Sequence, residues 1–402
     1  MSDFARHLLG WFDQCGRHDL PWQHPRTPYR VWLSEVMLQQ TQVQTVIPYF
    51  ERFMGELPDL PSLAAADTDQ VLALWSGLGY YARARNLHRA AQLCVERHDG
   101  DLPRDYEALA DLPGIGRSTA GAILAQAHGL RFAILDGNVK RTLSRFHGVE
   151  GWPGSGPAEK QLWELSRSHL PEDRLADYTQ AIMDFGATLC TRSDPACVLC
   201  PLQSSCVALR DGRTLELPQP KPGKPMPERR TLMLLLRDAE GRVLLARRPP
   251  SGVWSGLWSL PEASDHDAAR DFLRLHVDTD FEGNRPLAPI DHAFSHYRLQ
   301  ITPLAWDGVR ERARIGDNPD LRWQPLDALV EVGLPAPVRR LLESLTAAVP
   351  KEPALAAPSS ARSTRSRPKA CPSCPGPARW ASACSRTSAA RPGRNGWRTR
   401  PW

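Results

Sequence analysis

The chain has 402 residues, enough for two or three domains, and its 42% hydrophobic content is typical of globular proteins. It has no run of about 18 apolar residues and no apolar leader, so we expect no membrane span, no secretory signal and a cytoplasmic location. Residues 351–402 hold 11 of the 50 basic residues and one of the 45 acidic residues, so residues 1–350 carry a net charge of −5. Bulk charge therefore gives no support for nucleic-acid binding by the folded part, which would need a local basic face.

Residues 1–208 show amphipathic helical periodicity with few β-type runs. We predict an all-α domain there. Its clearest helices are expected at residues 31–41, 68–75, 82–95, 118–127 and 159–168.

Residues 209–227 are expected to be a linker, because positions 218–227 contain five prolines and should be stiff and extended. Beyond it, residues 228–346 predict a smaller α+β domain. Strands are expected at 231–236 and 243–246 around a turn at 238–241, a further strand at 292–304, and a closing helix at 338–345. Residues 347–402 are rich in Ala, Pro, Ser and Arg, and are predicted to be a disordered basic tail.

A glycine-rich turn lies at residues 112–123, Leu-Pro-Gly-Ile-Gly-Arg-Ser-Thr-Ala-Gly-Ala-Ile. Gly114 and Gly116 allow a tight turn into the start of a helix, where backbone N–H groups point outward and can bind a phosphate. An ordinary helix–turn–helix corner would have the same pattern. Asp136, 22 positions after Gly114, is a carboxylate that could act beside a bound DNA backbone.

Four cysteines, Cys190, Cys197, Cys200 and Cys206, lie within 17 residues with six, two and five residues between them. In a reducing compartment such a group indicates a metal centre rather than disulfides. Zinc and a four-iron cluster both accept four thiolates, but zinc ribbons more often use two Cys-x2-Cys pairs. The spacing therefore favours a [4Fe-4S] cluster.

The cysteine quartet after a glycine hairpin and an aspartate resembles the endonuclease III (helix-hairpin-helix) superfamily of DNA glycosylases. Three further segments resemble its MutY family of adenine glycosylases: Thr-Pro-Tyr-Arg-Val-Trp-Leu-Ser-Glu-Val-Met-Leu-Gln-Gln-Thr at 27–41, Gly-Leu-Gly-Tyr-Tyr-Ala-Arg-Ala-Arg-Asn at 77–86 and Leu-Asp-Gly-Asn-Val-Lys-Arg at 135–141. The resemblance covers about residues 4–345. It implies a six-helix barrel with an iron–sulfur region, then a Nudix-like domain that recognises 8-oxoguanine.

This resemblance implies an enzyme that removes adenine mispaired with 8-oxoguanine or guanine from double-stranded DNA. It also implies a monomer acting at the bacterial nucleoid. By the same resemblance, Glu35 protonates the adenine and Asp136 stabilises positive charge on the sugar. Glu35 must then sit in a dry setting that keeps its proton, whereas Asp136 must stay ionised, helped by Asn138.

From local pattern alone, Glu35 could be a solvated helix-face charge and Asp136 a helix N-cap. Ser118 stands where lyases of the superfamily have a lysine. Since serine cannot form a Schiff base, we predict a monofunctional glycosylase that leaves an abasic site.

DNA contacts are expected at the hairpin and at two further places. The resemblance points to Gln40, Thr41, Leu78 and Tyr80 as residues that fill the gap left by the extruded adenine. Leu78 and Tyr80 could instead be core residues. In the second domain, the segment Phe294-Ser295-His296 matches the family's 8-oxoguanine loop.

The second domain contains Gly-Leu-Trp-Ser-Leu-Pro-Glu at 256–262, which resembles the start of a Nudix box. The paired glutamates that would hold Mg²⁺ do not follow, so pyrophosphohydrolase activity is not expected. Two alternatives to the adenine glycosylase stay open: a thymine–guanine mismatch glycosylase of the same superfamily, and a non-catalytic iron–sulfur protein that binds DNA.

Overall fold

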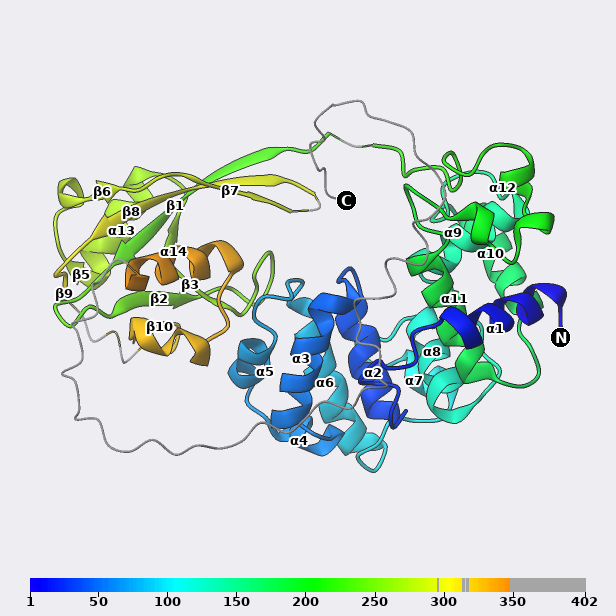
Figure 1. Ribbon diagram of the computed structural model, residues 1–402. Helices are drawn as coiled ribbons and strands as arrows, with labels where there is room; N and C mark the ends of the chain where they lie inside the picture. The colour runs from blue at the N-terminus through cyan, green and yellow to red at the C-terminus, as the bar shows by residue number, and fades with distance from the viewer. Residues whose placement is uncertain (224, 295, 313–314, 316–317, 348–402) are drawn as a thin grey trace, which may run out of the picture.

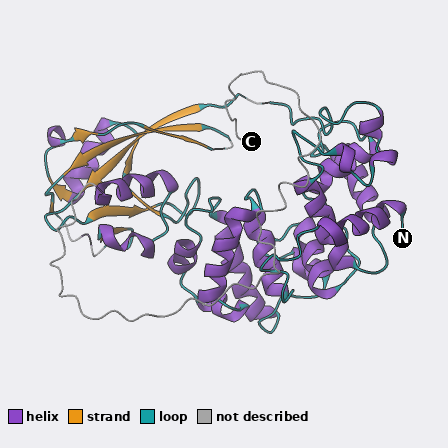
Figure 2. Cartoon of the chain, viewed as in Figure 1, coloured by secondary structure: helices purple, strands orange, loops and turns teal. Residues whose placement is uncertain are grey.

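The computed structural model describes residues 1–347 except 224, 295, 313–314 and 316–317. Figure 1 shows three blocks in a row: a β-rich domain at one end, helices α2–α6 in the middle, and α1 with α9–α12 at the other end. Figure 2 shows the strands gathered in the β-rich domain, whereas helices occur in both parts of the chain. No helix among the described residues is long and apolar enough to span a membrane. The predicted basic tail lies outside the described residues, apart from Ala347.

The middle block is built on a core of large aromatic side chains, including Trp32, Phe50, Phe53 and Trp75. Complete burial of a Phe side chain contributes roughly 1.5–3 kcal/mol. The helices around this core are α2 (Pro28–Leu38), α3 (Val43–Glu56), α4 (Leu60–Ala65), α5 (Thr68–Leu74), α6 (Ala82–Arg97), α7 (Tyr106–Ala110) and α8 (Arg117–His128).

Helix α2 begins three residues before the predicted residue 31, because the Thr27 side chain accepts the Arg30 N–H and Pro28 fits the first turn. It ends before the predicted residue 41 because Gln40 takes a φ of 59°.

The end block has a separate core, in which Phe12, Leu143, Leu162 and Phe185 are buried. It contains α1 (Asp3–Cys15), α9 (Gly137–His147), α10 (Gly156–Ser168), α11 (Leu175–Thr188), the short helices η1 (Cys197–Leu199) and η2 (Gln203–Ser205), and α12 (Val207–Arg210). Helix α8 joins the two blocks: its Ile123 packs into the first core and its Ala122 into the second.

The β-rich domain has its main sheet packed between the helices α13 and α14. Its strands are β1 (Glu228–Leu236), β2 (Val243–Arg247), β3 (Trp258–Ser259), β4 (Glu262–Ala263), β5 (Val277–Asp278), β6 (Arg285–Pro286), β7 (Ile290–Ala293), β8 (Arg298–Trp306), β9 (Arg310–Glu311) and β10 (Leu321–Gln324). The helices are α13 (His266–His276), α14 (Ala336–Ala347), η3 (Phe281–Gly283) and η5 (Leu326–Glu331).

Strand β1 is the centre of this domain, paired with β8 in parallel and with β4 antiparallel. Its side chains alternate between the two faces, as a strand requires. Met233 and Leu235 pack with Val338 of α14, whereas Leu234 and Leu236 pack with Leu273 of α13. β2 forms a second small sheet with β3 and β10.

The prediction of one strand over residues 292–304 was wrong. The segment forms the end of β7, a turn, and most of β8, and the two strands pair antiparallel with Ile290 opposite Ile301. The long β-type run hid the turn because Phe294 and Tyr297 are themselves strand-forming residues.

Three hydrogen-bonded contacts attach the β-rich domain to α5 and α6. Asp69 at the start of α5 accepts two bonds from Arg247, of 3.2 and 2.8 Å, and one from the Trp258 indole. On the α6 side, Arg85 donates to the Ser255 carbonyl, and the Tyr81 hydroxyl donates to the Leu334 carbonyl at 3.0 Å. Leu257 of the second domain is buried in the first helical core.

Gly186 on α11 sets how closely α11 packs on α9. A Cβ atom at this position would lie 2.6 Å from Asn138 Cβ and 3.0 Å from the Asn138 carbonyl oxygen. We expect Gly186→Ala to destabilise the helical part by about 1–3 kcal/mol, because the two helices would be forced apart. Thermal and urea unfolding monitored by circular dichroism measure this.

The matched control is Gly10→Ala on α1, where a Cβ would meet nothing within 4 Å. That exchange should stabilise by about 0.5–1 kcal/mol through helix propensity. Equal effects of the two exchanges would contradict the proposed close packing.

Candidate active site

The largest cavity of the helical part lies where the two helix blocks face each other, with a volume of about 680 Å³. Glu35 enters it from α2 of the first block, and Asp136 enters from the start of α9 in the second. Ser118 and Asn138 also line it. Residues separated by about 100 positions in the chain therefore share one site.

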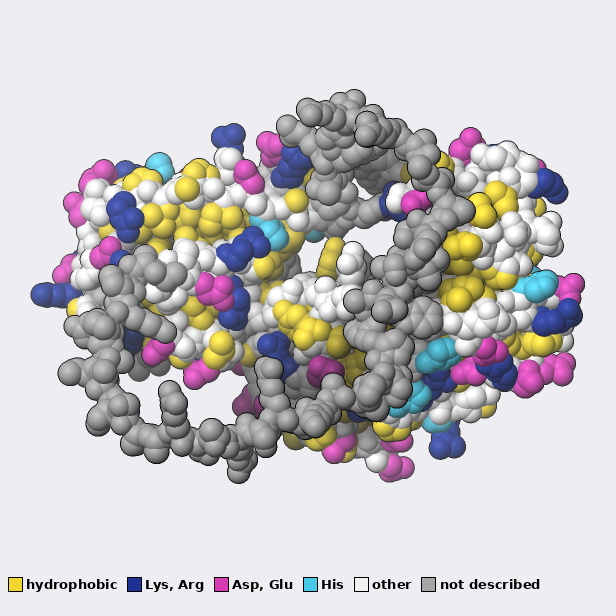
Figure 3. All heavy atoms as spheres, in the orientation of Figure 1, with side chains coloured by type: hydrophobic (Ala, Val, Ile, Leu, Met, Phe, Trp, Pro, Cys, Tyr) yellow, Lys and Arg dark blue, Asp and Glu magenta, His cyan; other side chains and the backbone are white. Residues whose placement is uncertain are grey.

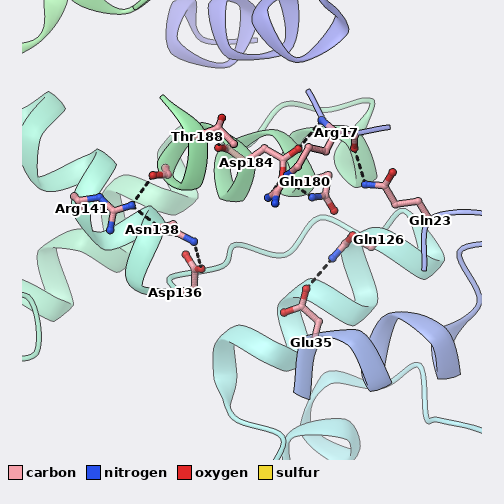
Figure 4. Close-up of polar contacts among 11 residues, drawn as sticks. Arg17, Gln23, Glu35, Gln126, Asp136, Asn138, Arg141, Gln180, Asp184 and Thr188 are labelled. Atoms are coloured by element: carbon pink, nitrogen blue, oxygen red, sulfur yellow. Dashed lines mark hydrogen bonds and ion pairs between the residues drawn. The ribbon is translucent and has the colours of Figure 1, made fainter. Parts of the chain in front are cut away.

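Glu35 is half-buried on α2 and contacts α8. Gln126 of α8 donates to Glu35 Oε1 at 3.2 Å, as Figure 4 shows. Burial is the main cause that raises the pKa of Glu35, to about 7; the nearby charge of Asp136 adds to it, and the Gln126 bond opposes it. A carboxyl group with this pKa holds its proton near neutral pH, which a general acid needs.

Asp136 is the N-cap of α9, so the helix-cap alternative is realised. Its Oδ1 accepts the Val139 N–H at 2.8 Å, and its Oδ2 accepts from Asn138 Nδ2 at 3.2 Å. These bonds and the charge of Arg141 favour the ionised form, yet burial outweighs them and raises the pKa of Asp136. The expected support from Asn138 is present, but the environment does not depress the pKa of this carboxyl.

Ser118 is the second residue of α8 and lies beside the segment that leads to Asp136. Its hydroxyl accepts the backbone N–H of Leu135 at 2.9 Å. Ser118 therefore fixes the residue before Asp136, and it also faces the cavity.

Several polar residues of the cavity were not predicted from the sequence. Arg17 and Gln180 both line it and both bind the fully buried Asp184, with Arg17 Nε 2.9 Å and Gln180 Nε2 2.8 Å from Asp184 Oδ1 (Figure 4). Gln126, which binds Glu35 from α8, was not predicted either. A buried Gln or Asp can be recognised as functional only when the helix that faces it is known. The sequence does not give that helix, so these residues were not predicted.

Arg141 links the aspartate to the cysteine region. It donates to Asn138 Oδ1 at 2.8 Å, and its other bonds go to the carbonyls of Gly186 and Cys190. The Asn138 side chain is thus held on both sides, by Arg141 and by Asp136 (Figure 4).

Cys190, Cys197, Cys200 and Cys206 line one small pocket, together with Arg145. The six cysteines in the described residues are free, so no disulfide forms among these four. No three His, Cys, Asp or Glu side chains in the described part of the chain are placed to hold a single metal ion. Four thiols around a common pocket are a donor set that a four-iron cluster could use.

The hairpin glycines have different roles. Gly114 has a φ of 80°, and a Cβ there would lie 2.9 Å from Asn86 Cβ, so both backbone and space require glycine. Gly116 is the N-cap of α8 with an ordinary φ of −85°, contrary to the expected special angle. A Cβ on Gly116 would meet nothing, which leaves its backbone open to close approach by a phosphate.

A second cavity of about 510 Å³ lies between the helical part and the β-rich domain. Gln40 and Tyr80 line it from the helical side, and Phe294 and His296 from the β7–β8 turn. Tyr80 is 48% exposed, whereas Leu78 is 6% exposed and belongs to the core. Thr41 instead lines the first cavity, and Ser295 lies outside the described residues.

Arg83 joins the two loops that carry Gln40 and Tyr80. One guanidinium nitrogen donates to the carbonyls of Val36, Met37 and Gln39, and the other to those of Leu78 and Gly79 and to the Thr41 hydroxyl. Gln40 and Tyr80 both adopt positive φ, of 59° and 50°. Such conformations persist only where surrounding bonds enforce them, so the loops are held in a fixed, strained shape.

Figure 3 shows basic and acidic side chains interspersed over the visible face of the helical part and of the β-rich domain. This agrees with the net negative charge of residues 1–350. Local contacts, rather than one broad basic surface, therefore have to supply binding on this face.

Comparison with known proteins gives two domain matches. Residues 33–168 match the HhH-GPD superfamily of base excision DNA repair proteins, and residues 232–344 match the NUDIX domain. A thermostable thymine-DNA glycosylase of known structure is 26% identical, with a TM-score of 0.47, and covers 52% of this chain and 95% of its own.

Curated relatives align with most of the chain. "Adenine DNA glycosylase" of Buchnera aphidicola subsp. Acyrthosiphon pisum (strain APS) is 35% identical over 344 residues, which is 85% of this chain and 97% of the relative. The human protein of that name is 34% identical, over 80% of this chain and 70% of its own length. The chain, with its HhH-GPD and NUDIX domains around two cavities, therefore belongs to the adenine DNA glycosylase family.

Proposed function

We propose that the chain is a monofunctional base-excision repair enzyme that removes adenine paired with 8-oxoguanine or guanine in double-stranded DNA. One observation carries the proposal: Glu35, with a pKa near 7, and the helix-capping Asp136 share one cavity between two helix blocks. Two carboxyl groups flanking a glycosidic bond are the usual equipment for its hydrolysis.

In the proposed reaction, the Glu35 carboxyl gives its proton to a ring nitrogen of adenine. The bond between C1′ and the base then breaks, and the base leaves as a neutral molecule. Asp136 stabilises the positive charge that develops on the sugar, as a carboxylate held by Asn138 and the Val139 N–H. Water adds to C1′ and releases its proton to a carboxylate, which leaves an abasic site.

Adenine reaches Glu35 only after it leaves the duplex. We propose that Gly114 and Gly116 hold the phosphate backbone, and that Gln40, Thr41, Leu78 and Tyr80 occupy or border the gap. The exposed side chain of Tyr80 and the positive φ angles of Gln40 and Tyr80 support this role for the two residues. Leu78 is buried in the structure without DNA, so its part requires movement of its loop.

We propose that the 8-oxoguanine that has lost its adenine partner binds in the interdomain cavity, against Phe294, Ser295 and His296. Support comes from the cavity itself, which is open to both Tyr80 and the β7–β8 turn. A hydrogen bond to the N7–H of 8-oxoguanine distinguishes it from guanine, which has no hydrogen there.

The four cysteines are proposed to hold a [4Fe-4S] cluster. The cluster would cross-link η1, η2 and α12, which have few regular bonds of their own, and so fix the segment that Arg141 and Arg145 contact. No redox step is needed for base removal.

Family membership supports adenine over thymine as the target base, and the two carboxyl groups argue against a purely DNA-binding protein. The enzyme is proposed to act as a monomer on the bacterial chromosome. A glycosylase assay on A·8-oxoguanine, A·G and T·G duplexes distinguishes the proposed enzyme from a thymine–guanine mismatch glycosylase and from a non-catalytic DNA-binding protein.

Glu35→Gln should lower the single-turnover rate of adenine release by about 10²–10⁴-fold, because the amide keeps the shape but cannot give up a proton. The assay compares duplexes with A·8-oxoguanine, A·G and T·G pairs. Glu51→Gln, an exposed change on α3, is the control and should retain full activity. Cleavage by the unmodified enzyme only at T·G, or at none of the three, would refute the proposal.

The rate of excision should fall as pH rises through about 7, approaching tenfold per pH unit, because Glu35 then loses its proton. An acid-side fall is expected too, when Asp136, whose pKa burial raises, becomes protonated. Rates under saturating enzyme separate this from DNA binding. A rate that stays constant from pH 6 to 9 would show that Glu35 is not the acid.

Replacing Ser295 or His296 by Ala should reduce the preference for A·8-oxoguanine over A·G by about 5–150-fold, the loss of one discriminating contact of about 1–3 kcal/mol. The ratio of kcat/KM on the two duplexes measures it. The A·G rate itself should change little. Exposed Arg298→Gln on the neighbouring strand is the control.

Borohydride should trap no covalent intermediate with DNA, because Ser118 binds the Leu135 N–H and cannot form an imine. The products should be free adenine and an intact strand that breaks only on alkali treatment. A bifunctional lyase serves as the positive control. Stoichiometric adducts required for adenine release would overturn the monofunctional assignment.

A further inference from the structure

Arg145 on α9 is a buried cation without a carboxylate partner among the described residues. Arg145 is only 3% exposed. Its guanidinium nitrogens donate to the carbonyls of Thr191 at 2.6 Å, Arg192 at 2.8 Å and Leu217 at 2.9 Å. All of these partners are neutral. Burying an uncompensated charge costs several kcal/mol, so the protein needs a reason to keep it.

The other buried charge of this block is treated differently. Asp184 is fully buried, but Arg17 supplies a guanidinium and a backbone N–H to its two oxygens. Arg145 instead contacts Cys190, with Nη1 3.4 Å from both its carbonyl oxygen and its thiol Sγ. The Cys206 thiol in turn lies 3.6 Å from the Arg145 carbonyl oxygen.

We propose that Arg145 is the counter-cation of the iron–sulfur cluster held by the cysteine quartet, and that its charge sets the reduction potential and oxidative resistance of that cluster. This inference rests on the proposed iron–sulfur cluster. Four thiolates bring four negative charges into the pocket, and a fixed guanidinium against one sulfur offsets part of them. Net charge and hydrogen bonds to sulfur are the main means by which proteins tune such clusters.

The sign of the effect follows from electrostatics. A positive charge beside the cluster favours its more negative, more reduced form, so it raises the reduction potential. Removal of that charge should shift the potential to more negative values and make oxidation easier. Cluster loss in air should then become severalfold faster.

The test uses full-length protein purified without oxygen. Arg145→Gln removes the charge, Arg145→Lys keeps it with fewer hydrogen bonds, and Arg210→Gln is the control, because Arg210 is an exposed residue of α12 paired with Asp211. Iron and sulfide per chain, visible absorption during exposure to air, and the potential on a DNA-coated electrode are measured. Circular dichroism reports folding.

We expect Arg145→Lys and Arg210→Gln to retain the wild-type potential, and Arg145→Gln to show a negative shift and faster cluster loss. Unchanged values in Arg145→Gln, or equal changes in the Gln and Lys variants, would overturn the role of charge. If Arg145→Gln does not fold, the reduction potential of Arg145→Lys decides. A potential equal to that of the wild type supports the role of charge, and a different potential overturns it. A wild-type protein without iron would instead refute the cluster itself.

Discussion

The contact between two separately packed helix blocks is the constraint on which the site depends. Each block buries its own apolar core, and only α8 contributes to both. A cavity remains where the blocks meet, and burial of Glu35 there raises its pKa to about 7. The acid, the capping aspartate and the hairpin are thus positioned by how the blocks meet, while the close approach of Gly186 to Asn138 fixes α9 on α11 within the end block.

The sequence predicted the order of structural elements well, for reasons that lie in local physics. Helical periodicity, Thr27 with Pro28, and Gly114 are read directly from neighbouring residues. The proline-rich segment before β1 likewise has no helix or strand in its described residues. The β7–β8 turn was missed because aromatic residues form it, and the end of α2 was missed because Arg83, 43 positions beyond Gln40, enforces that residue's backbone.

The candidate site was predicted only in part. Glu35 and Asp136 came from motif resemblance, and their common cavity agrees with that pairing, although their roles stay predictions. Gln126, Arg17, Gln180 and Arg145 gave no signal, since their importance arises from partners on other helices. The pKa of Asp136 also escaped sequence reasoning, because burial cannot be judged from hydrogen-bonding neighbours alone.

The β-rich domain is attached twice, by the linker that leaves the helical part after Leu217 and by the contacts of Asp69, Arg85 and Tyr81 (Figure 1). The first attachment is covalent and the second is not. Separation of the second is therefore followed by re-docking within one molecule, at an effective concentration set by a short tether rather than by the amount of protein in the cell. A modest set of hydrogen bonds, together with Leu257 in the helical core, then suffices to hold the domain against the helical part.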